Sequence, residues 1–236
     1  VTTLPFVPLI ELAGQVRVIT LPRRSWLATF QTGMRLRREG FERVVDLQGN
    51  RASRCLAWLA GPRAERAGLW PGWPYHTATQ IPRYPLVHAE KRAAELARTL
   101  RLPEATQALP VPEKLETRIG RWLESKQLTG KRIVLMHAGC SQAWVTKRWP
   151  AAHFIQTART LADNGYHVLW LGTREEASLN SGLSGQTGTA ATDQFSLDEL
   201  FALGRHAAFA VTNDSGPMHV LAAAGLPASG LSAKAT

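Results

Sequence analysis

The chain has 236 residues, of which 44% are hydrophobic and 19% are charged, with 19 glycines and 14 prolines. This composition is too apolar for a disordered chain, and the ordinary glycine and proline contents exclude collagen-like and low-complexity structure. No apolar run reaches the roughly 18–20 residues of a membrane-spanning helix. The 28 basic and 18 acidic residues leave a formal charge of +10, which favours anionic partners such as phosphates, acidic sugars or anionic lipid surfaces.

The two cysteines, Cys55 and Cys140, lie far apart in the sequence. They form neither a disulfide framework nor a CxxC metal motif, so we expect a reducing compartment and packed thiols. The histidines lack metal-ligand spacing, and we expect no metal site. Basic residues occur in short scattered groups without zinc-finger or RNA-recognition motifs, so we expect no nucleic-acid partner.

In the first half, strand-like and helix-like stretches alternate. Residues 16–20 alternate as a short strand does, and residues 44–47 form a short apolar run that ends in a turn at Gln48 and Gly49. Residues 61–87 are rich in proline, glycine and aromatic residues, so we expect an ordered loop there. Helices are expected at residues 27–38, 51–60 and 88–101.

The second half alternates more clearly and follows a proline-rich linker at residues 103–112. We therefore expect two domains, residues 1–105 and 106–236. Ser196 and Glu199 form a capping box, which marks the start of one helix. The alternation predicts parallel sheets with helices on both faces. The expected strands are 133–136, 166–171 and 208–211, and the expected helices are 115–123, 151–164, 196–203 and 217–224.

The segment Asn213-Asp214-Ser215-Gly216-Pro217 leads from a strand into a helix through a tight turn. Backbone N–H groups and the positive end of the helix dipole would face the carboxyl end of a parallel strand, where phosphates bind. Asp214 could accept hydrogen bonds from sugar hydroxyls, or it could simply cap the helix.

A second candidate joins a strand end to a basic pair. Gly139, in the small-residue loop after the strand at 133–136, could let a ligand approach the backbone closely. Lys147, beside Arg148, could meet a diphosphate as a point charge. The alternative is a solvated basic pair before a helix.

Acidic residues follow two further strands. Glu176 and its neighbour Glu175 come just after the strand at 166–171, where an acidic residue commonly binds a ribose hydroxyl. An acidic helix start would have the same pattern. Asp46 ends the strand at 44–47, and it could face an acceptor or only precede a capped helix.

Taken in order, these motifs resemble glycosyltransferase family 9, the ADP-heptose:lipopolysaccharide heptosyltransferases. The resemblance spans essentially the whole chain, since Val45-Asp46-Leu47-Gln48-Gly49 also matches the acceptor-side domain of the family. The matching residues of the second half are His137-Ala138-Gly139, Lys147-Arg148-Trp149-Pro150, Phe154, Gly165, Leu171-Gly172, Glu176, Phe195-Ser196-Leu197, Leu200, Asp214-Ser215-Gly216-Pro217-Met218-His219, Ala222-Ala223-Ala224, Gly225 and Pro227.

The resemblance implies a GT-B fold, with two Rossmann-like domains whose parallel sheets face a cleft. The C-terminal domain would bind ADP-heptose and the N-terminal domain a lipid-linked acidic oligosaccharide. The implied reaction is inverting transfer of heptose to a Kdo or heptose hydroxyl of the lipopolysaccharide inner core, without metal or cofactor. The implied donor-binding residues are Gly139, Lys147, Glu176, Asp214, Ser215, Gly216 and His219, and the acceptor-side residues are Asp46, Gln48, Arg51 and Arg54.

The excess of basic over acidic residues, together with the resemblance, predicts a cytoplasmic enzyme that docks on the anionic surface of the inner membrane. The amphipathic candidate is residues 23–38, where arginines accompany Trp26, Leu27, Phe30 and Met34. An ordinary surface helix is the alternative.

Members of this family begin with a strand and a Gly-Asp turn, whose Asp would be the base, upstream of the segment that Val1 matches. They also continue through a loop and a helix after the position that Thr236 matches. We therefore expect a fragment that does not transfer sugar as written, with Asp46 as the alternative base. Two rival functions are a related enzyme with another nucleotide-sugar donor and a non-catalytic nucleotide-binding module.

Overall fold

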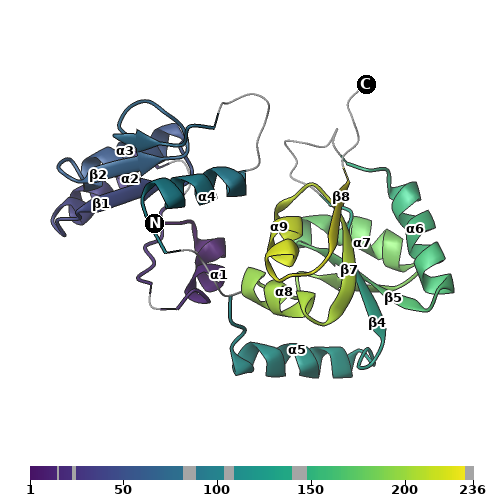
Figure 1. Ribbon diagram of the computed structural model, residues 1–236. Helices are drawn as coiled ribbons and strands as arrows, with labels where there is room; N and C mark the ends of the chain where they lie inside the picture. The colour runs from purple at the N-terminus through teal and green to yellow at the C-terminus, as the bar shows by residue number, and fades with distance from the viewer. Residues whose placement is uncertain (15, 23–24, 82–88, 104–108, 140–147, 232–236) are drawn as a thin grey trace. The chain divides into compact units, whose positions relative to one another are not determined.

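The computed structural model describes residues 1–14, 16–22, 25–81, 89–103, 109–139 and 148–231. The chain forms two compact units (Figure 1): unit 1 comprises Val1–Leu4 and Ile19–Gln107, and unit 2 comprises Pro5–Val18 and Ala108–Thr236. The boundary expected at residues 105–106 stays a prediction, because residues 104–108 lie outside the described residues. The attachment of residues 5–18 to unit 2 was not expected from the sequence.

Unit 1 is built on a small sheet of three parallel strands in the order β1-β2-β3. Val45 of β1 lies opposite Ala67 of β2, which lies opposite Thr77 of β3. α3 packs against β1, α2 packs against α3, and Leu96 of α4 joins Ala67 and Leu69 in a small core. The bounds are α2 Trp26–Arg37, β1 Arg43–Asp46, α3 Arg51–Ala60, β2 Glu65–Gly68, β3 Thr77–Ala78 and α4 Ala89–Thr99.

The strand expected at residues 16–20 is wrong, because only an isolated bridge between Thr2 and Thr20 forms there. The chain passes from unit 2 to unit 1 within this segment, and Val16 stays exposed while Val18 and Ile19 are only half-buried, so the segment has no buried strand face. The other elements expected for this half are confirmed, namely the strand at 44–47 and the helices at 27–38, 51–60 and 88–101.

The loop expected at residues 61–87 contains two strands, β2 and β3. The pattern did not indicate β2 because its residues are charged or small and have low strand propensity. Its burial depends on contacts with other segments. The buried Arg66 guanidinium donates to the carbonyl oxygens of Gly61 (2.6 Å) and Pro74 (2.8 Å), and Gly68 packs against the Tyr75 ring.

Unit 2 has one sheet of five parallel strands in the order β6-β5-β4-β7-β8. The chain enters at the central strand β4, runs outward through β5 and β6, and returns to the other side of β4 with β7 and β8. This is a doubly wound order, and its topological switch point lies between β4 and β7. The bounds are η1 Leu4–Phe6, α1 Val7–Glu11, α5 Glu113–Ser125, β4 Arg132–His137, α6 Ala151–Asp163, β5 Tyr166–Gly172, η3 Arg174–Glu176, α7 Ala177–Ser184, β6 Thr189–Thr192, α8 Leu197–Gly204, β7 Ala207–Asn213, α9 Gly216–Ala223 and β8 Ala228–Leu231.

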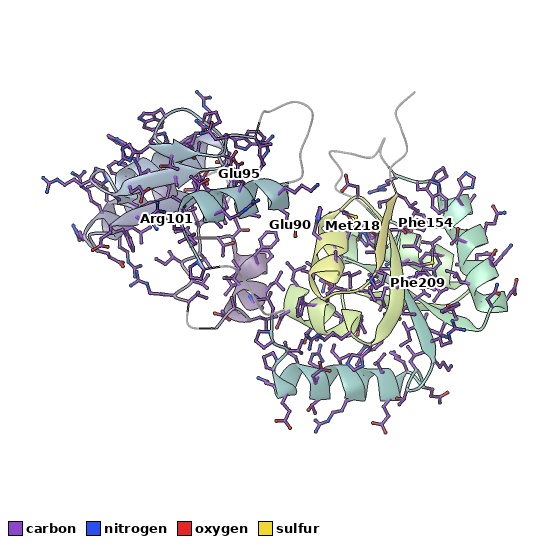
Figure 2. The ribbon with its side chains drawn as sticks, in the orientation of Figure 1. Glu90, Glu95, Arg101, Phe154, Phe209 and Met218 are labelled. Carbon is purple, nitrogen blue, oxygen red and sulfur yellow. The ribbon has the colours of Figure 1, made fainter. Side chains whose placement is uncertain are left out.

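Both faces of the unit 2 sheet are buried, as parallel sheets require. Leu135 of β4 belongs to the core that the sheet forms with α5, α8 and α9, and Leu12, just after α1, joins the same core. Met136 belongs to the core on the other face, with α6 and α7. Phe154 of α6, labelled in Figure 2, is fully buried in this second core. The Leu12 contact explains why residues 5–18 belong to unit 2.

The strands and helices expected for this half are confirmed, and the α/β class with two parallel sheets with them. The Ser196–Glu199 capping interaction is also present, with Ser196 N–H donating to the Glu199 carboxylate at 2.9 Å. The pattern missed α7, β6 and β8. Their sequences consist largely of alanine, serine, threonine and glycine, which produce no clear hydrophobic period.

Candidate functional site

The carboxyl ends of β4 and β7 lie side by side at the switch point, where ligands of open α/β sheets bind. Asn213, the last residue of β7, connects the two strand ends by hydrogen bonds. Its buried side chain donates to the carbonyl oxygens of Ala138 (2.8 Å) and Gly139 (3.2 Å) and accepts from the Trp149 N–H (2.9 Å). The loop after β4 and the approach to α6 are therefore held against β7.

α9 begins directly beyond β7, with Ser215 as its N-cap residue and Pro217 in its first turn, and no side chain among the described residues is seen to cap it. The alternative in which Asp214 caps this helix is therefore wrong. Asp214 is exposed and precedes the cap. A Cβ on Gly216 would meet no atom within 4 Å, so no protein contact requires glycine there. An uncapped first turn at the positive end of a helix dipole is suited to an anion.

Glu176 lies just beyond β5, in the 3-10 turn η3. The acidic helix start that the pattern allowed is present, because Oε2 of Glu176 accepts a hydrogen bond from the Thr173 N–H at 2.8 Å in a capping box. The same oxygen lies 3.4 Å from Nε2 of His137, the last residue of β4. Glu175, in contrast, is exposed.

The Glu176 carboxylate is an anion at neutral pH. Burial favours a raised pKa for Glu176, but hydrogen bonds from His137 and Thr173 outweigh it and hold the pKa below its ordinary value of 4.5. Gly139 leaves space for this group, since a Cβ on Gly139 would lie 1.4 Å from Oε1 of Glu176. The absent side chain at position 139 thus allows the placement of Glu176, a reason that the sequence did not reveal.

Contacts connect three of the expected donor-binding residues, Gly139, Glu176 and Ser215, with His137 between the last two. Gly139 packs against Glu176, and Oγ of Ser215 lies 3.2 Å from Nδ1 of His137. His219 is exposed in the first turn of α9. Lys147 lies outside the described residues, as does the cysteine at position 140.

Sequence reasoning assigned no role to His137 or Asn213, although both were visible in the motifs. Each is a polar residue at the end of an otherwise apolar strand. In the structure, both side chains are buried and link separate strand ends. A polar residue that ends a buried strand is the signal that could have identified them.

The Asp46 carboxylate, at the end of β1 in unit 1, organises a turn. One oxygen accepts from the N–H groups of Gln48 (2.8 Å) and Gly49 (3.0 Å), and the other accepts from the Tyr75 hydroxyl (2.5 Å). Burial and the bond to Asp46 raise the pKa of Tyr75. Asn50 then caps α3 by accepting from the Ser53 N–H at 2.9 Å. Both Asp46 oxygens thus already accept hydrogen bonds. This agrees with the alternative in which Asp46 only precedes a capped helix.

Arg54 lines a pocket of about 630 Å³ at the carboxyl edge of the unit 1 sheet. Its guanidinium donates to the carbonyl oxygens of Gly49 (3.1 Å) and Trp73 (2.8 Å), so it also holds the pocket wall in place. The expected acceptor-side residues Gln48 and Arg51 are exposed. The lining residues are Gly49, Arg54, Trp70, Pro71, Gly72, Tyr75, His76, Ala78, Thr79, Gln80 and Ile81.

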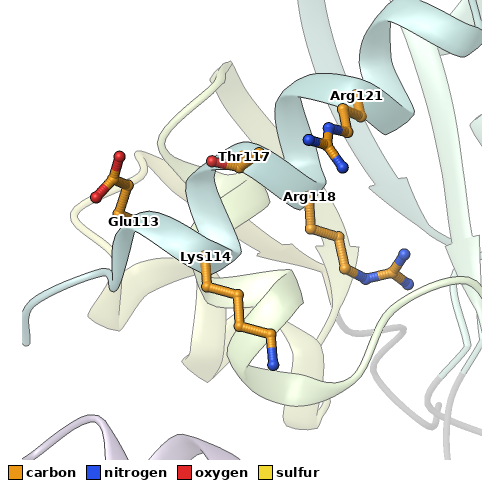
Figure 3. A pocket seen from close by; sticks show the side chains of 5 residues that line it. All are labelled: Glu113, Lys114, Thr117, Arg118 and Arg121. Atoms are coloured by element: carbon orange, nitrogen blue, oxygen red, sulfur yellow. The ribbon is translucent and has the colours of Figure 1, made fainter.

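Other features of the described residues carry no catalytic arrangement. A hollow on α5 is lined by Glu113, Lys114, Thr117, Arg118 and Arg121 (Figure 3), but Arg118 is already paired with Glu199. In the part of the chain that the structure describes, no group of three or more His, Cys, Asp or Glu side chains could hold a metal ion. No helix within those residues is long and apolar enough to cross a membrane.

Comparisons with known proteins match both the sequence and the fold. The sequence model of glycosyltransferase family 9 (heptosyltransferase) matches residues 29–234. None of the curated proteins compared with the chain matches it.

Solved structures do match the chain. A family 9 glycosyl transferase from Veillonella parvula has a TM-score of 0.76 at 20% identity, covering 93% of this chain and 68% of that chain. The E. coli ADP-heptose lipopolysaccharide heptosyltransferase II has a TM-score of 0.72 at 21% identity, covering 96% and 72%. An E. coli heptosyltransferase solved with ADP has a TM-score of 0.64 at 22% identity, covering 90% and 69%. These likenesses confirm the expected fold class.

Proposed function

The chain belongs to glycosyltransferase family 9, and on this premise we propose that unit 2 binds the ADP-sugar donor at the carboxyl ends of β4, β5 and β7. One observation carries the proposal. The uncapped start of α9 and the Glu176 carboxylate lie on opposite sides of one imidazole, that of His137. The start of α9 can bind a phosphate, and the Glu176 carboxylate can accept hydrogen bonds from hydroxyl groups. Only the His137 imidazole separates them, so the diphosphate and the ribose of one nucleoside diphosphate can reach both.

Each part of the donor then has a partner. The diphosphate lies at the first turn of α9, near Ser215 and Gly216, and Lys147 supplies a positive charge. The ribose hydroxyls donate to Glu176, in the role that strand-end carboxylates have in doubly wound folds. The exposed Asp214 and His219 face the sugar. The donor sugar is heptose, by likeness to the E. coli enzyme whose name specifies ADP-heptose.

The proposed reaction is inverting transfer without a metal ion or cofactor. Negative charge develops on the leaving diphosphate, and the α9 dipole together with Lys147 stabilises it in place of a divalent cation. A base must also remove the proton of the acceptor hydroxyl. Asp46 is less suited to this role, because its two oxygens already accept hydrogen bonds from Gln48, Gly49 and Tyr75.

We further propose that the pocket beside Arg54 receives the acidic acceptor, a Kdo or heptose of the lipopolysaccharide inner core. Arg51 is exposed at the start of α3 and provides a donor fork for a sugar carboxylate. Trp70 and Tyr75 line the same pocket with aromatic rings, against which the apolar face of a sugar packs. Arg51→Ala should weaken binding of a Kdo-bearing acceptor, measured by calorimetry, and leave affinity for ADP unchanged.

Calorimetry with ADP and ADP-heptose tests the donor site. We expect binding that EDTA does not alter, and a loss of about tenfold in Glu176→Gln, since a hydrogen bond to a charged group is removed. Glu175→Gln is the matched control, because Glu175 is the adjacent exposed carboxylate, and its affinity should equal that of the wild type. Binding abolished by EDTA, or equal losses in the two variants, would refute the site.

We also propose that the exposed face of α2 docks on an anionic membrane surface at the cytoplasmic side of the inner membrane. Trp26, Leu27, Phe30 and Met34 are all exposed on this helix, and Arg35, Arg37 and Arg38 are exposed at its end; Arg23 and Arg24 lie outside the described residues.

Apolar and basic side chains on one face are the pattern of helices that lie in the membrane interface. Flotation with anionic vesicles should show binding that salt weakens and that Phe30→Ala reduces. Equal binding to neutral vesicles would contradict this proposal.

A further inference from the structure

His137 is buried at the point where three strand ends of unit 2 meet. It ends β4, is 3% exposed, and contacts one residue beyond β5 and one beyond β7. Its Nε2 lies 3.4 Å from the Glu176 carboxylate and its Nδ1 lies 3.2 Å from the Ser215 hydroxyl. Both ring nitrogens are therefore occupied by side chains of the proposed donor site.

The hydrogen-bond roles follow from the chemistry of the three groups. A carboxylate only accepts, so Nε2 of His137 carries the proton that faces Glu176. In the neutral ring, Nδ1 then accepts from the Ser215 hydroxyl. The hydroxyl has a single proton, which it can instead donate to the Asn213 carbonyl oxygen at 3.1 Å, and both of these acceptors are on the sheet side of the turn.

Ser215 differs in this respect from Ser25 and Asn50, the N-cap residues of α2 and α3. Serine is among the strongest N-caps because its oxygen accepts from the N–H groups of the first turn. Ser25 does this at α2, accepting from Ala28 at 3.1 Å, and Asn50 does it at α3. Ser215 holds the same position at α9, yet its oxygen makes no cap hydrogen bond.

We propose that His137 is a positioning residue that draws the Ser215 hydroxyl away from α9 and keeps the first-turn N–H groups of this helix open for a phosphate. The same imidazole fixes the Glu176 carboxylate for the ribose. The inference rests on the proposed donor site, and it adds the reason why a helix that starts with serine remains uncapped there. As a consequence, Nδ1 of His137 affects binding of the diphosphate, and Nε2 affects binding of the ribose.

Two substitutions separate these ends. In His137→Gln the terminal amide takes the place of Nε2, so the bond to Glu176 is kept and the bond to Ser215 is lost. In His137→Asn the shorter amide takes the place of Nδ1, so the opposite bond is kept. The ligands are ADP and adenosine, which share the ribose and differ in the diphosphate.

We expect His137→Gln to weaken ADP binding about fivefold, the factor that an ordinary helix cap corresponds to, and to leave adenosine binding unchanged. His137→Asn should weaken both ligands alike, by about tenfold. The variant His137→Gln/Ser215→Ala should recover the ADP affinity of Ser215→Ala alone, because no hydroxyl remains to cap α9. Thermal unfolding of each variant measures any general loss of structure.

Equal weakening of ADP and adenosine in His137→Gln would overturn the proposal, and so would a double variant that does not recover. Either result would mean that His137 acts only by supporting the fold. Failure of the proposed donor site has a different signature: the wild-type chain would not bind ADP, or Glu176→Gln would bind it as tightly as the wild type.

Discussion

Gly139→Ala is a small change with a defined steric consequence in the proposed donor site. The added methyl would lie 1.4 Å from Oε1 and 2.2 Å from Cδ of Glu176, so the carboxylate must leave its place. It then loses the bonds from Thr173 N–H at 2.8 Å and from His137 at 3.4 Å. Hydrogen bonds to charged groups contribute roughly 1.5–3 kcal/mol each, and the displaced carboxylate regains water, so we expect a net loss of about 1–3 kcal/mol in unfolding free energy.

The affinity for ADP should fall about tenfold as well, because the ribose ligand has moved. Urea denaturation and calorimetry measure the two effects. Gly120→Ala on α5 is the control, since a Cβ there meets nothing within 4 Å and alanine favours a helix by about 0.5–1 kcal/mol. Unchanged stability and ADP affinity in Gly139→Ala would show that Glu176 does not occupy this space.

Three further predictions follow from the charged groups. Asp46→Ala should destabilise unit 1 by about 2–4 kcal/mol through the loss of three hydrogen bonds to a buried carboxylate, whereas the exposed Glu42→Ala should not; equal denaturation midpoints would contradict the turn's role. Because the folded-state pKa of Glu176 is lowered, its contribution to stability is present above its ordinary pKa of 4.5 and is lost as pH falls through the folded-state value. Unfolding measured at pH 7 and pH 3 should therefore show a smaller acid loss in Glu176→Gln, and an unchanged loss would refute the assignment. Lys147→Ala should weaken ADP binding by about 1.5–3 kcal/mol, whereas Lys131→Ala, just before β4, should not; equal effects in calorimetry would refute the placement of Lys147.

The sequence predicted elements wherever hydrophobic periodicity was strong. The apolar runs of β4, β5 and β7 and the amphipathic α6 are examples, and the structure places them close to the expected bounds. β2, β6 and β8 were missed, because their residues are charged or small and their burial depends on neighbouring strands. Strand order was also beyond pattern analysis, since periodicity reveals that a strand is buried but not which strand lies beside it.

The candidate site was predictable in its position and only partly in its chemistry. The turn at Asp214–Gly216 is a local signal, so it could be read from residue types alone. The reason for Gly139 could not, because the group that needs its space is Glu176, which follows a different strand. Asp46 illustrates the same limit, since the Tyr75 hydroxyl that engages it lies 29 positions along the chain.

A crystal structure of this chain with ADP is the most direct test of the central claim. We expect the diphosphate at the first turn of α9, the ribose hydroxyls on the Glu176 carboxylate, and the Ser215 hydroxyl still directed to His137. ADP bound elsewhere on unit 2, or bound at α9 with the ribose away from Glu176, would contradict it.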